Sequence, residues 1–365
     1  MTNARALVVA GLLAALVSGL LAGCATPGPP DASVRGRLHL GMDDAPEGAR
    51  LMWPAAPEVP RFLYTGTLVG APNFKRDEAA TSGLARFGRW LAGLDERAEA
   101  PLVLQRPNAV IGDDEGRLFV SDTSRQAVFV FDEKAGALLL WEQASEGQRF
   151  VAPAGIALAP ARVWVADAEL GAVFELDAQG TPQRTLGRGL LVRPTGVARD
   201  AASGRLYVAD TMAHDIKVFD AGGAHVQTIG RRGEAPGEFN FPTHLTFAAG
   251  ELYVTDTLNN RVQVLDAAGR PLRRLGARGL VVGNLVRPKG VGVDAEGNVY
   301  VVESYYDSLL VFSREGEFLM PIGGTGTATG RFYLPAGVWV DARNRVHIAD
   351  MFNGRIVLFQ FLGGG

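Results

Sequence analysis

The chain has 365 residues, of which 47% are hydrophobic and 21% are charged, and its formal net charge is −3. This near-neutral balance argues against the strongly basic surface that binds nucleic acid through its phosphates. With one cysteine the chain forms no internal disulfide, so a folded domain must be stabilised by its apolar core.

The N-terminal segment has the pattern of a secretion signal. Arg5 supplies a positive charge, and residues 6–21 are almost wholly apolar. This stretch is short for a membrane-spanning helix but typical of a signal-peptide core. It is followed by Ala and Gly directly before Cys24, which resembles the lipobox of bacterial lipoproteins. The resemblance implies that residues 1–23 are removed and that Cys24 is lipidated; an ordinary signal peptide cut near Ala22 is the alternative.

The residues after the cysteine bear on location and on flexibility. Ala25 is not the aspartate that typically retains lipoproteins at the inner membrane of enteric-type bacteria. By that resemblance we expect an outer-membrane lipoprotein that faces the periplasm and is held in the membrane through lipid on Cys24. Residues 24–59 are rich in Pro, Ala and Gly, a composition that does not bury a core, so we expect a semi-extended tether there.

The rest of the chain, residues 60–365, contains six copies of one pattern. Each copy opens with a proline and an apolar strand, continues with a second strand that ends in an acid, and has a third strand followed by a glycine turn. The prolines are 41 to 48 residues apart, the period of a four-stranded propeller blade. The opening prolines are Pro107, Pro153, Pro194, Pro242, Pro288 and Pro335.

The second strands align residue by residue. Five of them carry an aromatic residue at the second place, and His347 takes that place in the sixth. Segments such as residues 194–198 and 206–211 resemble NHL repeats, which are known from six-bladed propellers. The resemblance covers residues 60–70 and 103–360 and implies an all-β, six-bladed β-propeller. It implies little about function, because this fold carries many unrelated functions.

The sixth repeat ends after three strands, at residues 355–360. A propeller that does not join its first and last blades leaves exposed sheet edges. A further strand, residues 61–69, lies upstream of the first repeat. We therefore predict that this N-terminal strand pairs with residues 355–360 and closes the ring.

A short helical insertion is expected between the closing strand and the first repeat, at about residues 77–97. Apolar residues recur there at helical spacing from Leu84 to Leu94, with Trp90 beside them. In propellers this link lies on the top face, so we expect the helix near the channel mouth. It either packs on the blades or docks on a partner or membrane, and burial of Trp90 distinguishes the two.

The repeated acids and His244 are the residues of the repeats that could bind a metal or act in catalysis. We expect the acids at the ends of the second strands to accept turn N–H groups rather than bind a metal. His244 stands where the other repeats have a small residue, which places its imidazole near the channel. Zinc-dependent peptidyl-hydroxyglycine lyases share the fold but use several histidines, and lactonase-like propellers hold calcium with a central set of Asn, Asp and Glu. Neither set is present, so we predict no catalytic residue, no metal and no cofactor; Asn108 is the one carboxamide at these strand starts.

The predicted binding surface is a patch on the top face of the propeller. Aromatic, Met and Arg side chains are enriched there, as in the cores of protein interfaces. Its members are Tyr305, Tyr306, Phe352, Met351, Met212, Leu258, Arg106, Arg193, Arg287, Lys289 and His244. The sequence thus favours a non-catalytic binding or scaffolding module for a protein, peptide or glycan at the cell envelope, without nucleic-acid binding. The alternative is a hydrolase or lyase with an atypical site around His244, Lys289 and Asn108.

Overall fold

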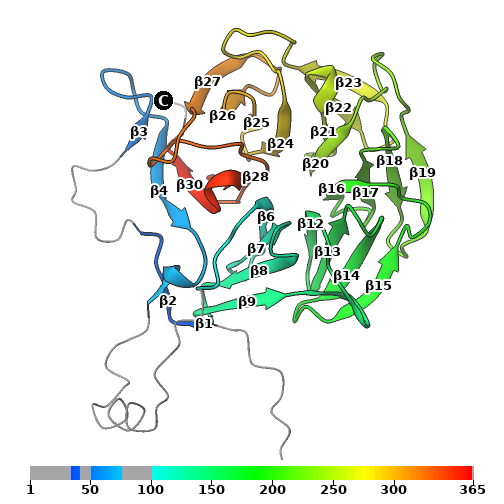
Figure 1. The fold of residues 1–365 in the computed structure, drawn as a ribbon. Helices are drawn as coiled ribbons and strands as arrows, with labels where there is room; N and C mark the ends of the chain where they lie inside the picture. Colours follow the sequence, from blue (N-terminus) through cyan, green and yellow to red (C-terminus); the bar gives the residue numbers. More distant parts are fainter. Residues whose placement is uncertain (1–33, 42–50, 76–100, 364–365) are drawn as a thin grey trace, which may run out of the picture. The chain divides into compact units, whose positions relative to one another are not determined.

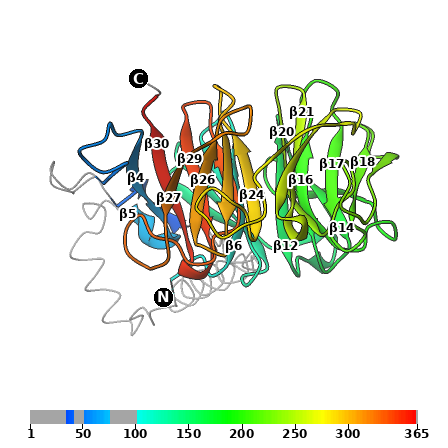
Figure 2. The same ribbon diagram turned by 90° about the horizontal axis from the view of Figure 1, so that it is seen from above.

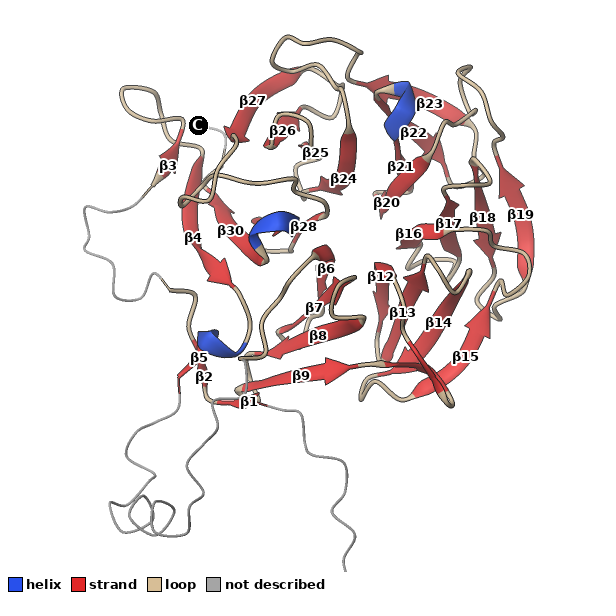
Figure 3. Ribbon diagram, viewed as in Figure 1, coloured by secondary structure: helices blue, strands red, loops and turns tan. Residues whose placement is uncertain are grey.

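The computed structural model describes residues 34–41, 51–75 and 101–363. In these residues the chain forms six sheets of four or five strands around a common axis, joined by turns and a few 3-10 helices (Figure 1; Figure 3). The predicted six-bladed, all-β propeller is confirmed. The expected signal peptide 1–23, Cys24 and the expected helix 77–97 lie outside the described residues. None of the helices within the described ranges has the length and apolar character needed to span a bilayer.

Each blade is an antiparallel meander that runs outward from the axis. The inner strands are β6 (Pro107–Gly112), β12 (Pro153–Ala159), β16 (Pro194–Arg199), β20 (Pro242–Ala248), β24 (Pro288–Val293) and β28 (Val338–Val340). The second strands are β7 (Arg117–Asp122), β13 (Arg162–Asp167), β17 (Leu206–Asp210), β21 (Glu251–Asp256), β25 (Val299–Glu303) and β29 (Arg345–Asp350). The third strands are β8 (Ala127–Asp132), β14 (Ala172–Asp177), β18 (Asp215–Phe219), β22 (Arg261–Asp266), β26 (Ser308–Phe312) and β30 (Arg355–Phe361). The fourth strands are β9 (Ala137–Trp141), β15 (Pro182–Leu186), β19 (His225–Ile229), β23 (Pro271–Leu275), β27 (Phe318–Gly323) and β4 (Phe62–Leu68).

The two faces of the propeller carry different connections. One face, called here the top face, carries the links between blades and the turns after the second strands. Two of these turns contain 3-10 helices, η4 (Thr257–Asn259) and η5 (Met351–Asn353). The hairpin turns between first and second strands lie on the bottom face. Figure 2 shows the blades from the side, with β30 running from one face to the other. The hairpin of β10 (Gln143–Ser145) and β11 (Gln148–Arg149) decorates the link after the first blade.

The sixth blade closes the ring as predicted. β4 lies antiparallel to β30, with Leu68 opposite Ile356 and Phe62 opposite Phe361. Alternate residues of β4 are buried and half-buried, as expected for a strand with one face on a core. A short fifth strand, β3 (Met52–Trp53), pairs with β4 at the outer edge of the same sheet.

The expected tether is not free over its described parts, which corrects the boundary predicted at residue 60. β1 (Val34–Arg35) pairs with β9 of the first blade, and β2 (Arg37–Leu38) pairs with β5 (Phe74–Lys75). Farther along, the N–H of Thr67 in the sixth blade donates to the carbonyl of Leu40, at 2.9 Å. Residues 34–41, called the strap below, therefore connect the sixth blade to the first. The composition of residues 34–41 does not predict these strands, because two-residue strands are held by backbone hydrogen bonds and need few apolar side chains.

The buried side chain of Asn73 fixes the strap to the closing strand. Its Nδ2 donates to the carbonyls of His39 and Thr67, both at 2.8 Å. Its Oδ1 accepts the N–H groups of Val69 and Gly70. η2 (Ala71–Asn73) places this amide where the chain turns away from β4.

The apolar core is divided into six clusters, each shared by two neighbouring blades. The ring three residues before the acid that ends each second strand is at most 4% exposed, and in five of the six clusters this ring packs on the next blade. Tyr300 of β25, for example, packs against Val338 and Ile348 of the sixth blade. The six positions are Phe119, Trp164, Tyr207, Tyr253, Tyr300 and His347.

The acids that end the second strands hold the top-face turns together. Asp122 is fully buried, and its carboxylate accepts the N–H groups of Gln105 and Arg106 before the inner strand and of Ser124 and Arg125 in the following turn. The other five acids also accept backbone N–H groups from the segment before the inner strand of their blade. They are Asp167, Asp210, Asp256, Glu303 and Asp350. The predicted structural role is confirmed.

Candidate functional site

The inner strands crowd around a narrow channel. A Cβ on Gly196 would lie only 2.6 Å from the carbonyl oxygen of Thr243 on the neighbouring strand. Glycine at this level therefore permits the close approach of two backbones. His244 occupies the same level on β20 and is one of the side chains that line the channel cavity of about 190 Å³.

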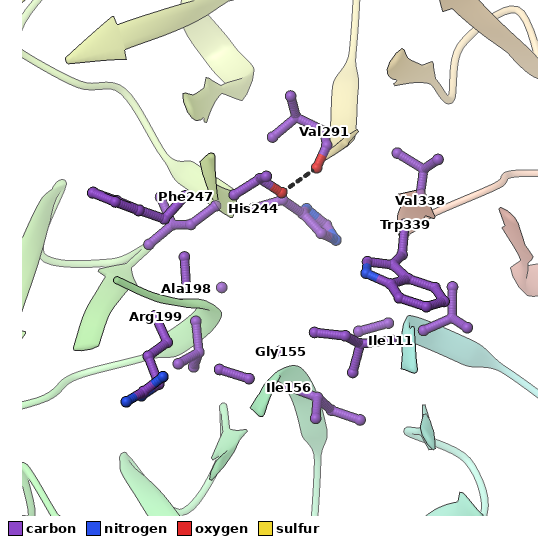
Figure 4. Close-up of a pocket in the computed structure, with 18 of the residues that line it drawn as sticks. Ile111, Gly155, Ile156, Ala198, Arg199, His244, Phe247, Val291, Val338 and Trp339 are labelled. Atoms are coloured by element: carbon purple, nitrogen blue, oxygen red, sulfur yellow. Dashed lines mark hydrogen bonds between the residues drawn. The ribbon is translucent and has the colours of Figure 1, made fainter. Parts of the chain in front are cut away.

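His244 is the polar group that most clearly faces this cavity. Figure 4 shows its imidazole and the indole of Trp339 pointing toward one another across the channel. Its Nδ1 lies 3.1 Å from Oγ1 of Thr243, while its buried Nε2 has no hydrogen-bond partner among the described residues. Burial, and then the charge of Lys289, lower the pKa of His244 to about 3, so the imidazole is neutral at physiological pH.

The three residues of the alternative enzyme site are not brought into one cavity. Burial and the neighbouring Arg287 lower the pKa of Lys289, but neither Lys289 nor Asn108 is in the wall of the channel cavity. The other channel walls are mainly apolar, and the hydroxyl of Thr246 donates to the carbonyl of Val291. Within the described ranges, no group of three or more His, Cys, Asp or Glu side chains is placed to hold a metal ion.

The predicted aromatic and Met residues do lie in top-face turns. Tyr305 is 54% exposed and packs edge to face on Tyr306, with ring centroids 4.9 Å apart. Leu258, Met212 and Phe352 are also exposed, whereas Met351 and Tyr306 are half-buried.

Sequence reasoning missed the most exposed apolar segment of this face. Leu280, Val281 and Val282 lie in the link between the fourth and fifth blades and are 75%, 72% and 66% exposed. The hydroxyl of Tyr306 donates to the carbonyl of Leu280, at 3.3 Å, which joins this link to the tyrosine pair. Three consecutive apolar residues between two glycines were the available signal. Residues 280–282 together with Tyr305 and Tyr306 are called the apolar patch below.

A second aromatic group lies on the sixth blade. Phe352 packs edge to face on Tyr333, another residue that the sequence analysis missed, and the guanidinium of Arg106 lies 5.0 Å from the Phe352 ring centroid. The other two predicted arginines have different surroundings. Arg193 forms an ion pair with Glu169 at 2.7 Å, and Arg287 is exposed. The predicted patch is therefore at least two groups of side chains around the channel mouth.

The fold and this face define a six-bladed β-propeller with exposed apolar and aromatic side chains on its top face. The family model DUF5128, described as a 6-bladed beta-propeller, matches residues 197–269 and 284–364. No curated protein matches the sequence.

Solved structures match the fold over most of the chain at low identity. A Bacteroides thetaiotaomicron protein of unknown function is 15% identical, with 70% of each chain covered and a TM-score of 0.58. An auxiliary nutrient binding protein from the same organism is 13% identical, with 71% of this chain and 70% of that chain covered and a TM-score of 0.54. A catalytically inactive virginiamycin B lyase from Staphylococcus aureus with quinupristin is 12% identical, with 70% and 95% covered and a TM-score of 0.52. At these identities the likeness concerns the fold alone.

Proposed function

We propose that this propeller is a non-catalytic binding module that takes a protein partner on its top face at the cell envelope. The observation that carries the proposal is the apolar patch, in which three consecutive side chains are each at least 66% exposed beside a tyrosine pair. Soluble monomers rarely expose contiguous apolar side chains of this kind unless a partner covers them. Each such side chain contributes about 1.5 to 3 kcal/mol when it is fully removed from water.

Variants of the patch test this proposal in partner capture from a membrane extract. Val281→Asp combined with Tyr305→Ala places a charge and a truncation at the expected centre of the interface, and we expect partner recovery to fall at least about ten-fold. Leu319→Asp is the matched control, because Leu319 is 52% exposed on the outer strand β27, away from the top face. Equal recovery with the patch variant and the control would show that the patch is not the interface.

The Phe352 group is tested separately by Phe352→Ala, which removes the ring that Tyr333 and Arg106 contact. If partner capture falls with this variant but not with the variant of the apolar patch, the binding surface lies on the sixth blade instead. Competition distinguishes glycan from peptide recognition. If the top face recognises glycan, an excess of soluble glycan releases the captured partner and an excess of peptide does not.

We also propose that Cys24 carries lipid and holds the propeller at the periplasmic side of the outer membrane. The support is the apolar stretch before it and its being the single cysteine of the chain. Metabolic labelling with a fatty-acid analogue is expected to mark the natural chain but not Cys24→Ala, which should leave the membrane fraction. Labelling of both proteins, or of neither, contradicts the proposal.

One observation favours a second candidate, a lyase or hydrolase. The charge of Lys289 adds to the effect of burial in lowering the pKa of His244, and the pKa of Lys289 is itself lowered by burial and by Arg287. Perturbed groups of this kind occur at catalytic sites as well as in structural positions. Turnover of quinupristin by the purified chain, lost in His244→Ala, would support an enzyme; a stoichiometric metal at the axis would also contradict the binding-module proposal.

A further inference from the structure

The contact between the sixth and first blades differs from the other five at one position. Elsewhere a Phe, Trp or Tyr ring from the second strand is buried at the boundary with the next blade. At this boundary the corresponding side chain is His347, whose imidazole is smaller than a phenol. The difference leaves space where the other blades have a ring.

The fifth blade shows what is missing. There the hydroxyl of Tyr300 donates to Oδ2 of Asp294, at 2.9 Å, in the hairpin turn that follows the inner strand. Asp341 has the equivalent place in the sixth blade, since its Oδ1 also accepts two N–H groups of its turn. His347 Nε2 lies 3.6 Å from Asp341 Oδ2, too far for a hydrogen bond. Both ring nitrogens of His347 are buried without a hydrogen-bond partner among the described residues.

A cavity of about 850 Å³ opens beside His347 and is called the seam pocket. This volume is within the range of sites for drug-sized ligands. Its apolar walls come from the first blade, the sixth blade and the strap. They are formed by Leu38, Leu40, Leu68, Leu118, Phe131, Trp339 and Leu358. Trp339 packs on His347 with ring centroids 5.0 Å apart, so the two rings form one continuous aromatic surface.

The charges that line the seam pocket nearly balance, with five basic and four acidic side chains, and four of these nine form ion pairs with one another. Asp113 pairs with Arg117 at 2.8 Å, and Asp341 pairs with Arg345 at 2.6 Å. Burial lowers the pKa of His347, although Asp341 opposes this effect, and the imidazole therefore offers one donor and one acceptor. An uncharged ligand fits these walls better than an ion, because an ion would face side chains of both signs.

We propose that the seam pocket binds a small uncharged ligand with a planar ring and a ring hydroxyl. The ring lies against Trp339 and His347, and the hydroxyl forms the hydrogen bond that an imidazole nitrogen now lacks. This chemistry is that of the tyrosine side chain buried at three of the other blade boundaries. The site is on the bottom face and is independent of the partner surface proposed above.

Titration with phenol, cyclohexanol and toluene tests the proposal, with histidine ring signals observed by NMR in the purified chain. We expect saturable binding of phenol that shifts the His347 signals. Toluene lacks the hydroxyl and cyclohexanol lacks the planar ring, and each is expected to bind at least about ten-fold more weakly. Equal affinity for phenol and toluene overturns the assigned hydroxyl contact, and equal affinity for phenol and cyclohexanol overturns the ring contact. Absence of saturable phenol binding overturns the site.

Filling the cavity from within provides the matching variant. His347→Tyr supplies the missing phenol, so we expect phenol affinity to fall at least about ten-fold and the melting temperature to rise. His225→Tyr is the control, because His225 is exposed on β19 of the third blade. If His347→Tyr does not fold, Leu118→Phe fills the pocket from the first blade and should also abolish binding. Undiminished phenol binding in the folded variant overturns the proposal.

Discussion

Gly66 offers a sharp test of how the strap is held against the closing strand. It lies at the irregularity where β4 pairs with Leu358 and Phe359, and its φ is 149°. A Cβ added there would lie 2.4 Å from Cβ of Leu40 and 2.5 Å from its carbonyl oxygen. That carbonyl accepts the N–H of Thr67, so it cannot retreat without losing the hydrogen bond. We therefore expect Gly66→Ala to displace the strap.

The expected cost has two parts. A non-glycine residue in an unfavourable backbone region costs about 1 to 3 kcal/mol, and forced overpacking costs a further 1 to 3 kcal/mol or so. We expect Gly66→Ala to lower the free energy of unfolding by about 3 kcal/mol. Gly250→Ala is the matched control: Gly250 has a φ of 80°, but no atom lies within 4 Å of its added Cβ. This control carries the strain without the clash.

Urea unfolding followed by tryptophan fluorescence measures the difference between the two variants. Hydrogen exchange of residues 34–41 reports on the strap directly and should accelerate in Gly66→Ala only. If the two variants unfold at the same urea concentration and exchange alike, the clash with Leu40 is not what fixes the strap, and the reasoning is refuted.

Three further predictions concern the blades. Asp122→Ala leaves four backbone N–H groups without their acceptor and should lower the free energy of unfolding in urea by about 4 kcal/mol or more. The control Asp132→Ala removes one exposed turn hydrogen bond and should lower it by about 1 kcal/mol or less. Similar losses in the two variants would contradict the structural role of the buried Asp122 carboxylate. Arg273 donates two hydrogen bonds to Glu251 and holds the pKa of that carboxyl below its usual value. The pair therefore stabilises the fold at pH values above the unfolded-state pKa of Glu251, near 4.5. This stabilisation is lost as the pH falls through the lower pKa of the folded state. Glu251→Gln should therefore destabilise the chain more at pH 7 than at pH 3, and an equal effect at both pH values in thermal melts would contradict the ion pair. A chain that starts at Ala71 lacks β4 and the strap and should melt at a lower temperature than the full chain by circular dichroism; unchanged melting would contradict the closure.

The parts of the fold that repeat could be predicted from the sequence. Six copies of one pattern identify blade boundaries because the same proline, aromatic and acid recur at the same places. The closing strand could be predicted because the last repeat lacks a fourth strand and a further strand lies upstream of the first repeat. The strap was missed because β1 and β2 have two residues each, and such strands leave no periodicity to read.

The candidate sites were harder to predict for a physical reason. Sequence placed Tyr305 and Phe352 in top-face turns, but exposure of Leu280 depends on how a link crosses between blades, which no local pattern records. His347 was interpreted as a member of the aromatic series. Its lack of hydrogen-bond partners and the cavity beside it arise from two blades and the strap, which come together only in the closed ring.

The closure also orders events in time during synthesis. The side chain of Arg61 donates to the carbonyl of Gly363, 302 residues later, so the sixth blade joins two segments that are far apart in the sequence. Contacts between such remote segments form late and slow the search for the native state. The ring can therefore close only after β30 has been synthesised, and until then the edge of β4 that pairs with β30 lacks its partner. Loss of β30 alone would therefore leave the sixth blade without the strand that pairs with β4, although β4 is synthesised almost 300 residues earlier.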